Sequence, residues 1–575
     1  MLPDFIWRIH MKHKKNIAIA MCIVATMFST NAESISAENM ESYGYIQSNL
    51  DGNTPVHVPD TYYDSGLAKY SDNEAVPSAY QNDIQEVKKK YPETRNQNPY
   101  GTCWSFASMG LAEFDLINDG SADRNIDLSE LQLAYFTYNF VEDPLGGTSG
   151  DMAKYYNENT STSFLERGGN FEYATRRLSQ WVGAIDESDL PYSKAYDAVT
   201  TGFDSSYAYS YDKVHLENAY EINIEKNTDD VKRAIMKNGA VGAMYMHHDN
   251  HIANLVWNDS LNCYTYYDTD KSGSGHAIMI VGWDDDFSKD NFEGTIKPEN
   301  DGAWLIRNSW GAYCDYFWMS YDTKSIVNTA WVMDFNSKDG YDNNYQLDGG
   351  IEVYPSYYKT LANVFQCNSK DGVAYETLKA VSLSMTSSAD VEYQIDVYTN
   401  LTDSRNPYSG IKQENATTKG KTTFAGIYNI KLNDSVTIMP GTNFAIVVTV
   451  DKAAIDQEQA TSWNSGNKTV WDRKVSKNTE NSLVLYDGKF YTQPNGNYCI
   501  KAFTSNNTMQ VIKGDLNNDG KIGINDLNRC VQGVSGRIEL TEQEYLSADI
   551  DGNGKVDIRD AMRLLYYVSG RDANL

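Results

Sequence analysis

Cysteine is scarce in this chain of 575 residues, which contains seven cysteines. Their spacing forces no disulfide framework. Apolar residues make up 41% of the chain, which is enough to build hydrophobic cores. The length favours about four domains.

Basic residues are also under-represented. The chain has 49 lysines and arginines against 78 aspartates and glutamates, so its net charge is −29. A surface this acidic repels nucleic acid and anionic membranes, and it favours solubility and cation binding. We therefore expect no nucleic-acid partner.

Long hydrophobic runs are missing as well. The apolar run Ile17–Phe28 is too short and wrongly flanked to span a bilayer. It follows a basic stretch with Lys12, Lys14 and Lys15, and the small residues Thr30-Asn31-Ala32 come after it. This pattern predicts a signal peptide, a secreted protein without a transmembrane span, and the loss of Cys22 with the signal.

One of the remaining cysteines lies where an irregular stretch turns into a helix, in QNPYGTCWSFASMGLAEF at Gln97–Phe114. The residues before Cys103 are typical of a turn. From Trp104 onward apolar residues recur at helical spacing, and Asn118-Asp119-Gly120 supplies a helix stop. The spacing predicts an amphipathic helix with Cys103 in its first turn.

A cysteine in the first helical turn can serve as a nucleophile. The positive end of the helix dipole stabilises a thiolate, and a thiol with a pKa of about 8.5 needs such help and a nearby base. Gln97 can bring its side-chain amide close to the backbone N–H of Cys103, and two such donors would form an oxyanion hole. The alternative is that Cys103 is a small buried core residue.

Two downstream blocks complete the pattern. SGHAIMIVGWDDDF places His276 just before a strand-like run, and WLIRNSWG places Asn308 at the end of another. Either residue alone could be structural, but these blocks and G-T-C-W-S-F-A at Gly101–Ala107 together resemble papain-like cysteine peptidases. The resemblance implies roles for four residues: Cys103 as nucleophile, His276 as base, Asn308 as the group that orients the imidazole, and Gln97 as oxyanion donor.

The same resemblance implies substrate-binding residues. Trp310 would cover the hydrogen bond between Asn308 and His276, and Gly168-Gly169 would leave the backbone free to pair with an extended substrate. The alternative for the glycine pair is a helix-flanking turn. Helices in the first half of this region and strands in the second match the two-lobed α+β fold of the family, with the cleft between the lobes.

Two local features lie outside these motifs. The run His247-His248-Asp249-Asn250-His251 could suggest a metal site, but it lacks cysteine or glutamate partners at ligand spacing, so we expect a solvated loop. Ser129 and Gln132 form a capping box that predicts the start of a second helix, within a segment similar to the LSEQ of the family.

From Asn344 to Ser505 helical periodicity almost disappears. Strand-like runs separated by turn residues occur at Lys379–Met385, Val391–Tyr398, Ala425–Leu432, Asn443–Val450, Ser482–Tyr486 and Tyr498–Ala502. They predict an antiparallel β-sandwich. The region resembles the lectin-like domain of clostridial surface peptidases, which leaves a glycan partner and a purely structural role both open.

The C-terminal region is a tandem repeat with a period of 34 residues, GDLNNDGKIGINDLNRCVQGVSGR followed by ADIDGNGKVDIRDAMRLLYYVSGR. Each copy has the oxygen ligands of a calcium loop and then a helix, expected at Leu527–Val534 and Ala561–Val568. The predicted ligands are Asp515, Asn517, Asp519, the Lys521 carbonyl and Asp526 in the first loop, and Asp549, Asp551, Asn553, the Lys555 carbonyl, Asp557 and Asp560 in the second. The pair resembles a dockerin, which implies two Ca²⁺ ions and a cohesin partner.

The sequence thus predicts a multidomain protein: an α+β papain-like two-lobed peptidase, an antiparallel β-sandwich and a small all-α calcium-binding dockerin. The expected ranges are 1–32 for the signal peptide, 33–76 for a pro-segment or linker, 77–338 for the peptidase, 339–505 for the lectin-like domain and 506–575 for the dockerin. The predicted function is a secreted cysteine endopeptidase that acts on proteins or peptides and is anchored to a cellulosome-type scaffold, without a cofactor for catalysis. The alternatives are a catalytically silent glycan- or protein-binding module and an enzyme that processes its neighbours on the scaffold.

Overall fold

The computed structural model describes residues 75–159, 163–247, 254–337, 339–368, 372–465, 467–475, 480–492, 496–508, 512–572 and 574–575. The predicted signal peptide and nearly all of the predicted pro-segment lie outside these residues. No helix among the described residues is long and apolar enough to cross a membrane.

The chain divides into two compact units. The first contains most residues up to Thr504, and the second contains Ser505–Leu575 with the short segments Cys367–Thr377 and Thr437–Gly441. The first unit therefore combines the predicted peptidase with the predicted β-sandwich.

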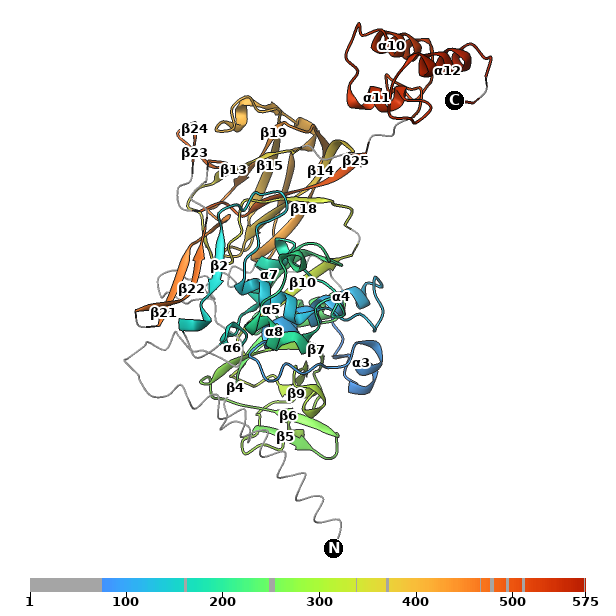
Figure 1. Ribbon diagram of the computed structural model, residues 1–575. Helices are drawn as coiled ribbons and strands as arrows, with labels where there is room; N and C mark the ends of the chain where they lie inside the picture. The colour runs from blue at the N-terminus through green and yellow to red at the C-terminus, as the bar shows by residue number, and fades with distance from the viewer. Residues whose placement is uncertain are drawn as a thin grey trace. The chain divides into compact units, whose positions relative to one another are not determined.

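Helices are concentrated in the first part of this unit, where Figure 1 shows α4, α5, α7 and α8 gathered in one group. The described helices before residue 340 are α3 (Ile84–Lys90), α4 (Cys103–Asn118), α5 (Glu130–Tyr138), α6 (Phe164–Arg167), α7 (Phe171–Ser179), α8 (Ala195–Thr200) and α9 (Thr228–Asn238). Helix α4 ends at Asn118 and Gly120 follows with φ +82°, so the predicted helix stop is confirmed. Ser129 caps α5 through its side chain, as the capping box predicts.

A sheet of 13 strands crosses this unit in the order β11-β25-β14-β18-β3-β10-β4-β7-β8-β9-β6-β5, and β1 pairs with β7. The strands are β1 (Ala79–Tyr80), β3 (His215–Asn223), β4 (Val241–His247), β5 (Leu255–Asn258), β6 (Cys263–Tyr266), β7 (Ser274–Asp284), β8 (Ala303–Arg307), β9 (Tyr316–Ser320), β10 (Thr329–Asn336), β11 (Asn343–Tyr345), β14 (Val373–Met385), β18 (Gly426–Ile438) and β25 (Ile500–Thr508). Helix α4 packs against β4, β7 and β10 of the sheet and against α5, α7 and α9.

Those contacts explain why α4 departs from the expected amphipathic pattern. Fourteen of its residues are buried, so the helix has almost no solvent face. Gly110 permits the close approach of α4 to the sheet, because a Cβ there would lie 2.6 Å from the Met279 Sδ on β7. A helix surrounded by apolar neighbours is hydrophobic on all sides.

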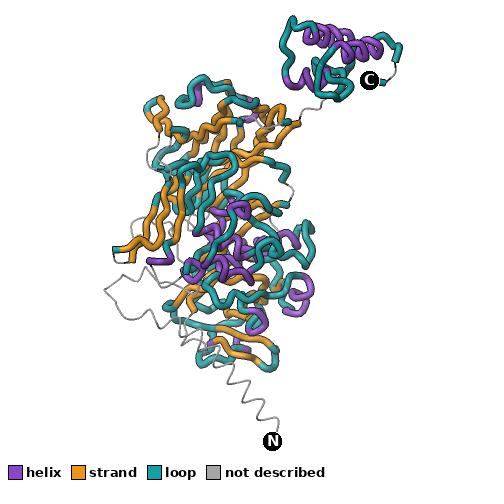
Figure 2. Tube along the Cα trace, in the orientation of Figure 1, coloured by secondary structure: helices purple, strands orange, loops and turns teal. Residues whose placement is uncertain are grey.

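After residue 340 the unit is nearly all strand and loop, as Figure 2 shows. A second sheet has seven strands in the order β16-β15-β19-β13-β23-β24, with β17 paired to β15. Its strands are β13 (Thr360–Gln366), β15 (Glu392–Thr399), β16 (Ile411–Lys412), β17 (Thr418–Lys421), β19 (Asn443–Val450), β23 (Ser482–Tyr486) and β24 (Lys489–Thr492). A two-stranded sheet pairs β12 (Val353–Pro355) with β20 (Asp456–Glu458). A three-stranded sheet contains β2 (Met152–Tyr155), β22 (Lys468–Lys474) and β21 (Thr461–Ser465).

The two sequence regions of this unit share structure instead of meeting at a simple boundary. Strand β18 pairs with β3 in antiparallel register, with Gly426 opposite Tyr220 and Ile427 opposite Ala219. The hydrophobic core around Cys103 and Trp104 also includes Trp471, from the β-rich region. The expected ranges 77–338 and 339–505 therefore describe sequence regions that are interlocked in one compact unit.

The second unit contains three described helices, α10 (Ile524–Val534), α11 (Glu542–Ala548) and α12 (Ile558–Val568). Helices α10 and α12 pack together around Leu527, Cys530 and Leu564. Both begin three residues earlier than the sequence predicts, because the loop residues Asp526 and Asp560 cap the helix start from inside its first turn.

Candidate active site and calcium loops

Cys103 is the first residue of α4 and is buried. Its Sγ accepts a hydrogen bond of 3.4 Å from the backbone N–H of Ala277, the residue after His276 on β7. The packing of α4 on β7 therefore brings the predicted nucleophile next to the predicted base.

His276 and Asn308 are joined by a hydrogen bond of 2.7 Å between the imidazole Nε2 and the amide Oδ1. Because the amide oxygen can only accept, Nε2 carries the proton and Nδ1 has a free lone pair. Nδ1 is buried and has no hydrogen-bond partner among the described residues. The imidazole is thus in the tautomer that can accept a proton at Nδ1.

Trp310 stacks on this pair. Its ring centroid lies 4.9 Å from that of His276, with the planes inclined by 26°. This is the covering position that the sequence predicts. A contact between Trp310 and substrate remains a prediction.

Gln97 is held close to the same loop. Its side-chain oxygen accepts a hydrogen bond of 2.6 Å from the Ser309 hydroxyl, and its side-chain nitrogen donates to the Tyr100 carbonyl at 3.0 Å. Its backbone N–H donates to the Ser309 carbonyl at 2.9 Å. The segment before Cys103 and the segment after Asn308 are therefore bound to each other, which fixes the amide of Gln97.

The glycine pair packs against the residue that follows the nucleophile. Gly168 has φ +90° and ends α6, and its carbonyl accepts a hydrogen bond from the Tyr138 hydroxyl. A Cβ on Gly169 would lie 2.3 Å from the Trp104 ring. The helix-flanking role is thus present, and pairing with substrate stays a prediction.

A small cavity lies behind these residues, between α4 and α5 on one side and β7 and β8 on the other. Its volume is about 10 Å³, and it is lined among others by Arg95, Glu130, Ala277 and Asn308. That volume suits about one water molecule. Arg95 pairs with Glu113 at 2.7 Å and with Glu130 at 3.0 Å, which ties the segment carrying Gln97 to α4 and α5.

The two repeats in the second unit have the same local geometry. Asp515 accepts backbone hydrogen bonds from Asp519 and Gly520, and the equivalent Asp549 accepts them from Asn553 and Gly554. The closing residues of the loops also repeat one pattern: Asp526 accepts from Leu516, Asn517 and Gly523, and Asp560 from Ile550, Asp551 and Asp557. The sequence repeat is therefore a structural repeat.

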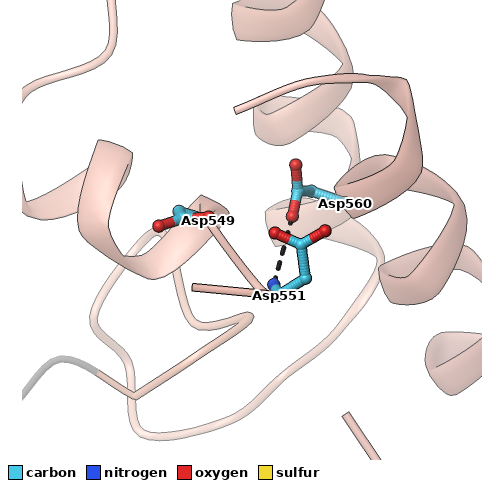
Figure 3. Close-up of side chains that lie close together, drawn as sticks. All are labelled: Asp549, Asp551 and Asp560. Atoms are coloured by element: carbon cyan, nitrogen blue, oxygen red, sulfur yellow. Dashed lines mark hydrogen bonds between the residues drawn. The ribbon is translucent and has the colours of Figure 1, made fainter. Parts of the chain in front are cut away.

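The second loop brings three carboxylates close together, those of Asp549, Asp551 and Asp560 (Figure 3). Oxygen atoms of Asp549, Asp551 and Asp560 lie within 4.8 Å of one another. An all-oxygen donor set of this kind fits a hard cation such as Ca²⁺. Asp557 instead pairs with Arg559 at 2.7 Å, so its predicted ligand role needs a different side-chain position.

Comparisons with known proteins agree with this geometry. Residues 78–332 match the family model described as papain family cysteine protease, residues 345–504 match the lectin like domain, and residues 513–569 match the dockerin type I domain. The chain carries a papain-family cysteine protease domain. The predicted lectin-like and dockerin regions are confirmed by the same comparison.

Solved structures extend the likeness beyond the papain-family domain. The clostridial cysteine protease Cwp84 after propeptide cleavage is 25% identical, covers 75% of this chain and 100% of its own, and gives a TM-score of 0.57. A second structure contains the cysteine protease and lectin-like domains of Cwp84, a surface layer associated protein of Clostridium difficile. It is 24% identical to this chain, and the match covers 76% of this chain and 90% of that one. The TM-score is again 0.57, so the two proteins share the fold.

Curated relatives match the papain-family domain alone. A cysteine protease of Blomia tropicalis is 24% identical over 226 residues, which are 39% of this chain and 55% of that protein. Cathepsin L 1 of Paramecium tetraurelia is 23% identical over 233 residues, which are 39% and 53% of the two chains. The chain spans about half the length of the curated relatives it matches.

Burial shifts the pKa values of both central groups of the papain-family site. Burial raises the pKa of the Cys103 thiol to about 12, and the N–H of Ala277 offsets only part of this shift. Burial also lowers the pKa of His276 to about 4, although the hydrogen bond to Asn308 acts in the opposite direction. Burial therefore acts against an ion pair of the two groups, while the backbone N–H groups of Ala277 and of the start of α4 favour the thiolate.

Two contributors to the site are missing from the sequence interpretation. Ser309 orients Gln97, and its position beside Asn308 could have indicated a role. His247 was expected in a solvated loop, but that expectation is wrong. It is the last residue of β4, and its side chain is buried. The centroid of its ring lies 5.3 Å from that of Trp310. The other residues of that histidine run, 248–251, lie outside the described residues.

Proposed function

We propose that the chain is a cysteine endopeptidase that hydrolyses peptide bonds at Cys103. The observation that carries this proposal is the hydrogen bond of 2.7 Å between His276 Nε2 and Asn308 Oδ1. It leaves the buried Nδ1 of His276 without a hydrogen-bond partner among the described residues. The next residue, Ala277, donates its backbone N–H to the sulfur of Cys103. All four positions of the family pattern are filled, which argues against a silent binding module.

In the proposed reaction, His276 Nδ1 takes the thiol proton as Cys103 Sγ attacks the scissile carbonyl carbon. The negative charge that develops on the carbonyl oxygen is stabilised by the side-chain amide of Gln97 and the backbone N–H of Cys103. The His276 imidazolium then protonates the leaving amine, and water hydrolyses the thioester to regenerate the thiol.

The test is peptide cleavage by the chain from residue 33 onward under reducing conditions. Cys103→Ala and His276→Ala should each lower kcat/KM by roughly 10³-fold or more, and Asn308→Ala should lower it less, because orientation is one contribution among several. Cys263→Ala is the matched control, since Cys263 is also a buried thiol but lies on β6. Cleavage that persists at full rate in Cys103→Ala would refute the mechanism.

We also propose that the C-terminal module binds two Ca²⁺ ions and attaches the enzyme to a cohesin of a cellulosome-type scaffold. Type I dockerins generally bind calcium. The carboxylate cluster of Asp549, Asp551 and Asp560 supports an ion in the second loop. The matching backbone hydrogen bonds of Asp515 and Asp526 extend the proposal to the first loop. The predicted signal peptide and the surface-associated relative support an extracellular or cell-surface location.

This proposal is tested by cohesin capture and calcium titration of the full chain. Asp515→Ala with Asp549→Ala should abolish calcium-dependent capture and leave peptide cleavage unchanged. Asp572→Ala, an acidic residue outside both loops, is the control. Capture that survives both a chelator and the double variant would overturn the calcium assignment.

A further inference from the structure

Helix α7 follows the Gly168–Gly169 pair, and Gly169 packs against the neighbour of Cys103. Gly168 and Gly169 are followed by Asn170, which caps α7 by accepting a hydrogen bond of 2.7 Å from the backbone N–H of Tyr173. Gly169 is in contact with Trp104, the neighbour of the nucleophile. A shift or rotation of α7 therefore moves the Gly168–Gly169 segment relative to Cys103.

The opposite side of α7 is held by the lectin-like region. The guanidinium of Arg176 is 2% exposed and donates to Asp456 Oδ2 at 2.9 Å and to the Thr386 hydroxyl at 2.8 Å. It also donates to the Ser384 hydroxyl at 2.5 Å. All three acceptors lie after residue 340, in β14, just after it or in β20.

The Asp456 carboxylate is itself fixed. Its Oδ2 accepts hydrogen bonds from the Ser384 hydroxyl at 2.6 Å, the Thr386 backbone N–H at 2.9 Å and the Thr386 hydroxyl at 2.8 Å. Arg176 therefore meets an acceptor that cannot turn away. Directional hydrogen bonds of this kind define the rotation and height of a helix more narrowly than apolar contacts do.

Further contacts continue along the same face of α7. Arg177 donates to the Gly349 carbonyl at 2.9 Å, and Tyr173 donates to Glu352 at 2.5 Å. Gln180, the C-terminal cap of the helix, donates to the Gly350 carbonyl at 2.8 Å. Side chains along about two turns of α7 and its C-terminal cap thus form hydrogen bonds to the lectin-like region.

We infer that Arg176 and Asp456 are positioning residues for substrate: through α7 they hold the Gly168–Gly169 segment at the distance from Cys103 that an extended peptide requires. The inference rests on the proposed peptidase function and deepens it. It assigns the lectin-like region a part in substrate binding that does not depend on sugar recognition. The residues act through α7 and do not touch the reacting atoms.

The inference predicts a separation of KM from kcat. Asp456→Asn keeps the shape of the side chain but removes the charge that compensates the buried guanidinium. KM for an extended peptide of six residues should rise roughly tenfold, while kcat should change less than about twofold. The reason is that the variant weakens binding of the substrate and of the transition state equally, whereas the chemistry at Cys103 is unchanged. A short amino-acid ester, which does not reach the glycine segment, should keep its KM.

Thr386→Val is the second variant, because it retains the volume and both charges and removes one hydroxyl shared by Arg176 and Asp456. It should shift KM for the long peptide in the same direction by about two- to threefold. Asp396→Asn is the matched control: this carboxylate is also buried and pairs with Lys412 at 3.3 Å, but on β15 of the second sheet.

The outcomes separate the two proposals. If the wild-type protein does not cleave the peptide or the ester through Cys103, the proposed function fails and the inference falls with it. If the wild type is active but Asp456→Asn and Thr386→Val lower only the unfolding temperature and leave the KM of the long peptide unchanged, the network is purely structural and the inference alone is overturned. An equal rise in KM for Asp396→Asn would also overturn it.

Discussion

The hydrogen bond between Ser309 and Gln97 should contribute to catalysis only through the oxyanion hole. The donor and acceptor lie 2.6 Å apart and both residues are buried. Gln97→Ala removes the proposed donor itself, which typically lowers kcat by about 10²–10³-fold. Ser309→Ala removes one orienting hydrogen bond, worth about 0.5–1.5 kcal/mol, so kcat should fall roughly 2- to 13-fold.

A double-mutant cycle tests whether the two effects share one cause. Since Ser309 acts through Gln97, adding Ser309→Ala to Gln97→Ala should cost nothing further, and the coupling energy should equal the whole effect of Ser309→Ala. The measurement is kcat and KM for a fluorogenic peptide across pH, where the profile should keep its shape because neither residue titrates. Additive losses in the double variant would refute the reasoning.

Three further predictions follow from the packing, and each has its own measurement. Residues 77–338 expressed alone should be insoluble or unfolded by circular dichroism, because β3 loses β18 and Arg176 loses its acceptors, whereas residues 77–508 should fold; a stable short fragment would contradict the shared sheet. Gly169→Ala should lower stability by about 1–3 kcal/mol through the clash with Trp104, while Gly294→Ala, where the nearest atom would be 3.5 Å away, should have little effect on the thermal unfolding temperature. Burial lowers the pKa of His215, but hydrogen bonds to Asp212 and Asp339 outweigh this effect and raise the pKa to about 9. The contribution of His215 to stability should therefore be complete below about pH 6.5 and lost as the pH rises through 9. The free energy of unfolding of His215→Gln, measured with denaturant, should lack this pH dependence.

The local elements of this chain were accessible from sequence because their signals are local. The helix at Cys103 and its end before Gly120 follow from apolar spacing and one glycine with positive φ. The Cys103, His276 and Asn308 blocks predict a site through their resemblance, in order and spacing, to the motifs of papain-like peptidases. The two loops of the C-terminal repeat align in register, so they were visible without any tertiary information.

What the sequence could not provide depends on contacts between distant residues. Nothing in the local pattern of β18 indicates that Ile427 lies opposite Ala219, so the lectin-like region was expected to be separate. Complete burial raises the pKa of the Cys103 thiol and lowers that of His276, and the motif alone does not reveal this effect. His247 was misplaced because its partner Trp310 is far away along the chain.

For the C-terminal attachment proposed above, the position of β25 has a mechanical consequence. The chain leaves the first unit from this strand, which ends at Thr508 and is hydrogen-bonded to β11 on one side and β14 on the other. The hydrogen bonds between neighbouring strands run perpendicular to the strands. Tension applied along β25 therefore shears the hydrogen bonds to β11 and those to β14 at the same time. Forced unfolding is governed by the unfolding rate, and a strand clamped on both sides should therefore keep the catalytic unit intact while its tether is pulled.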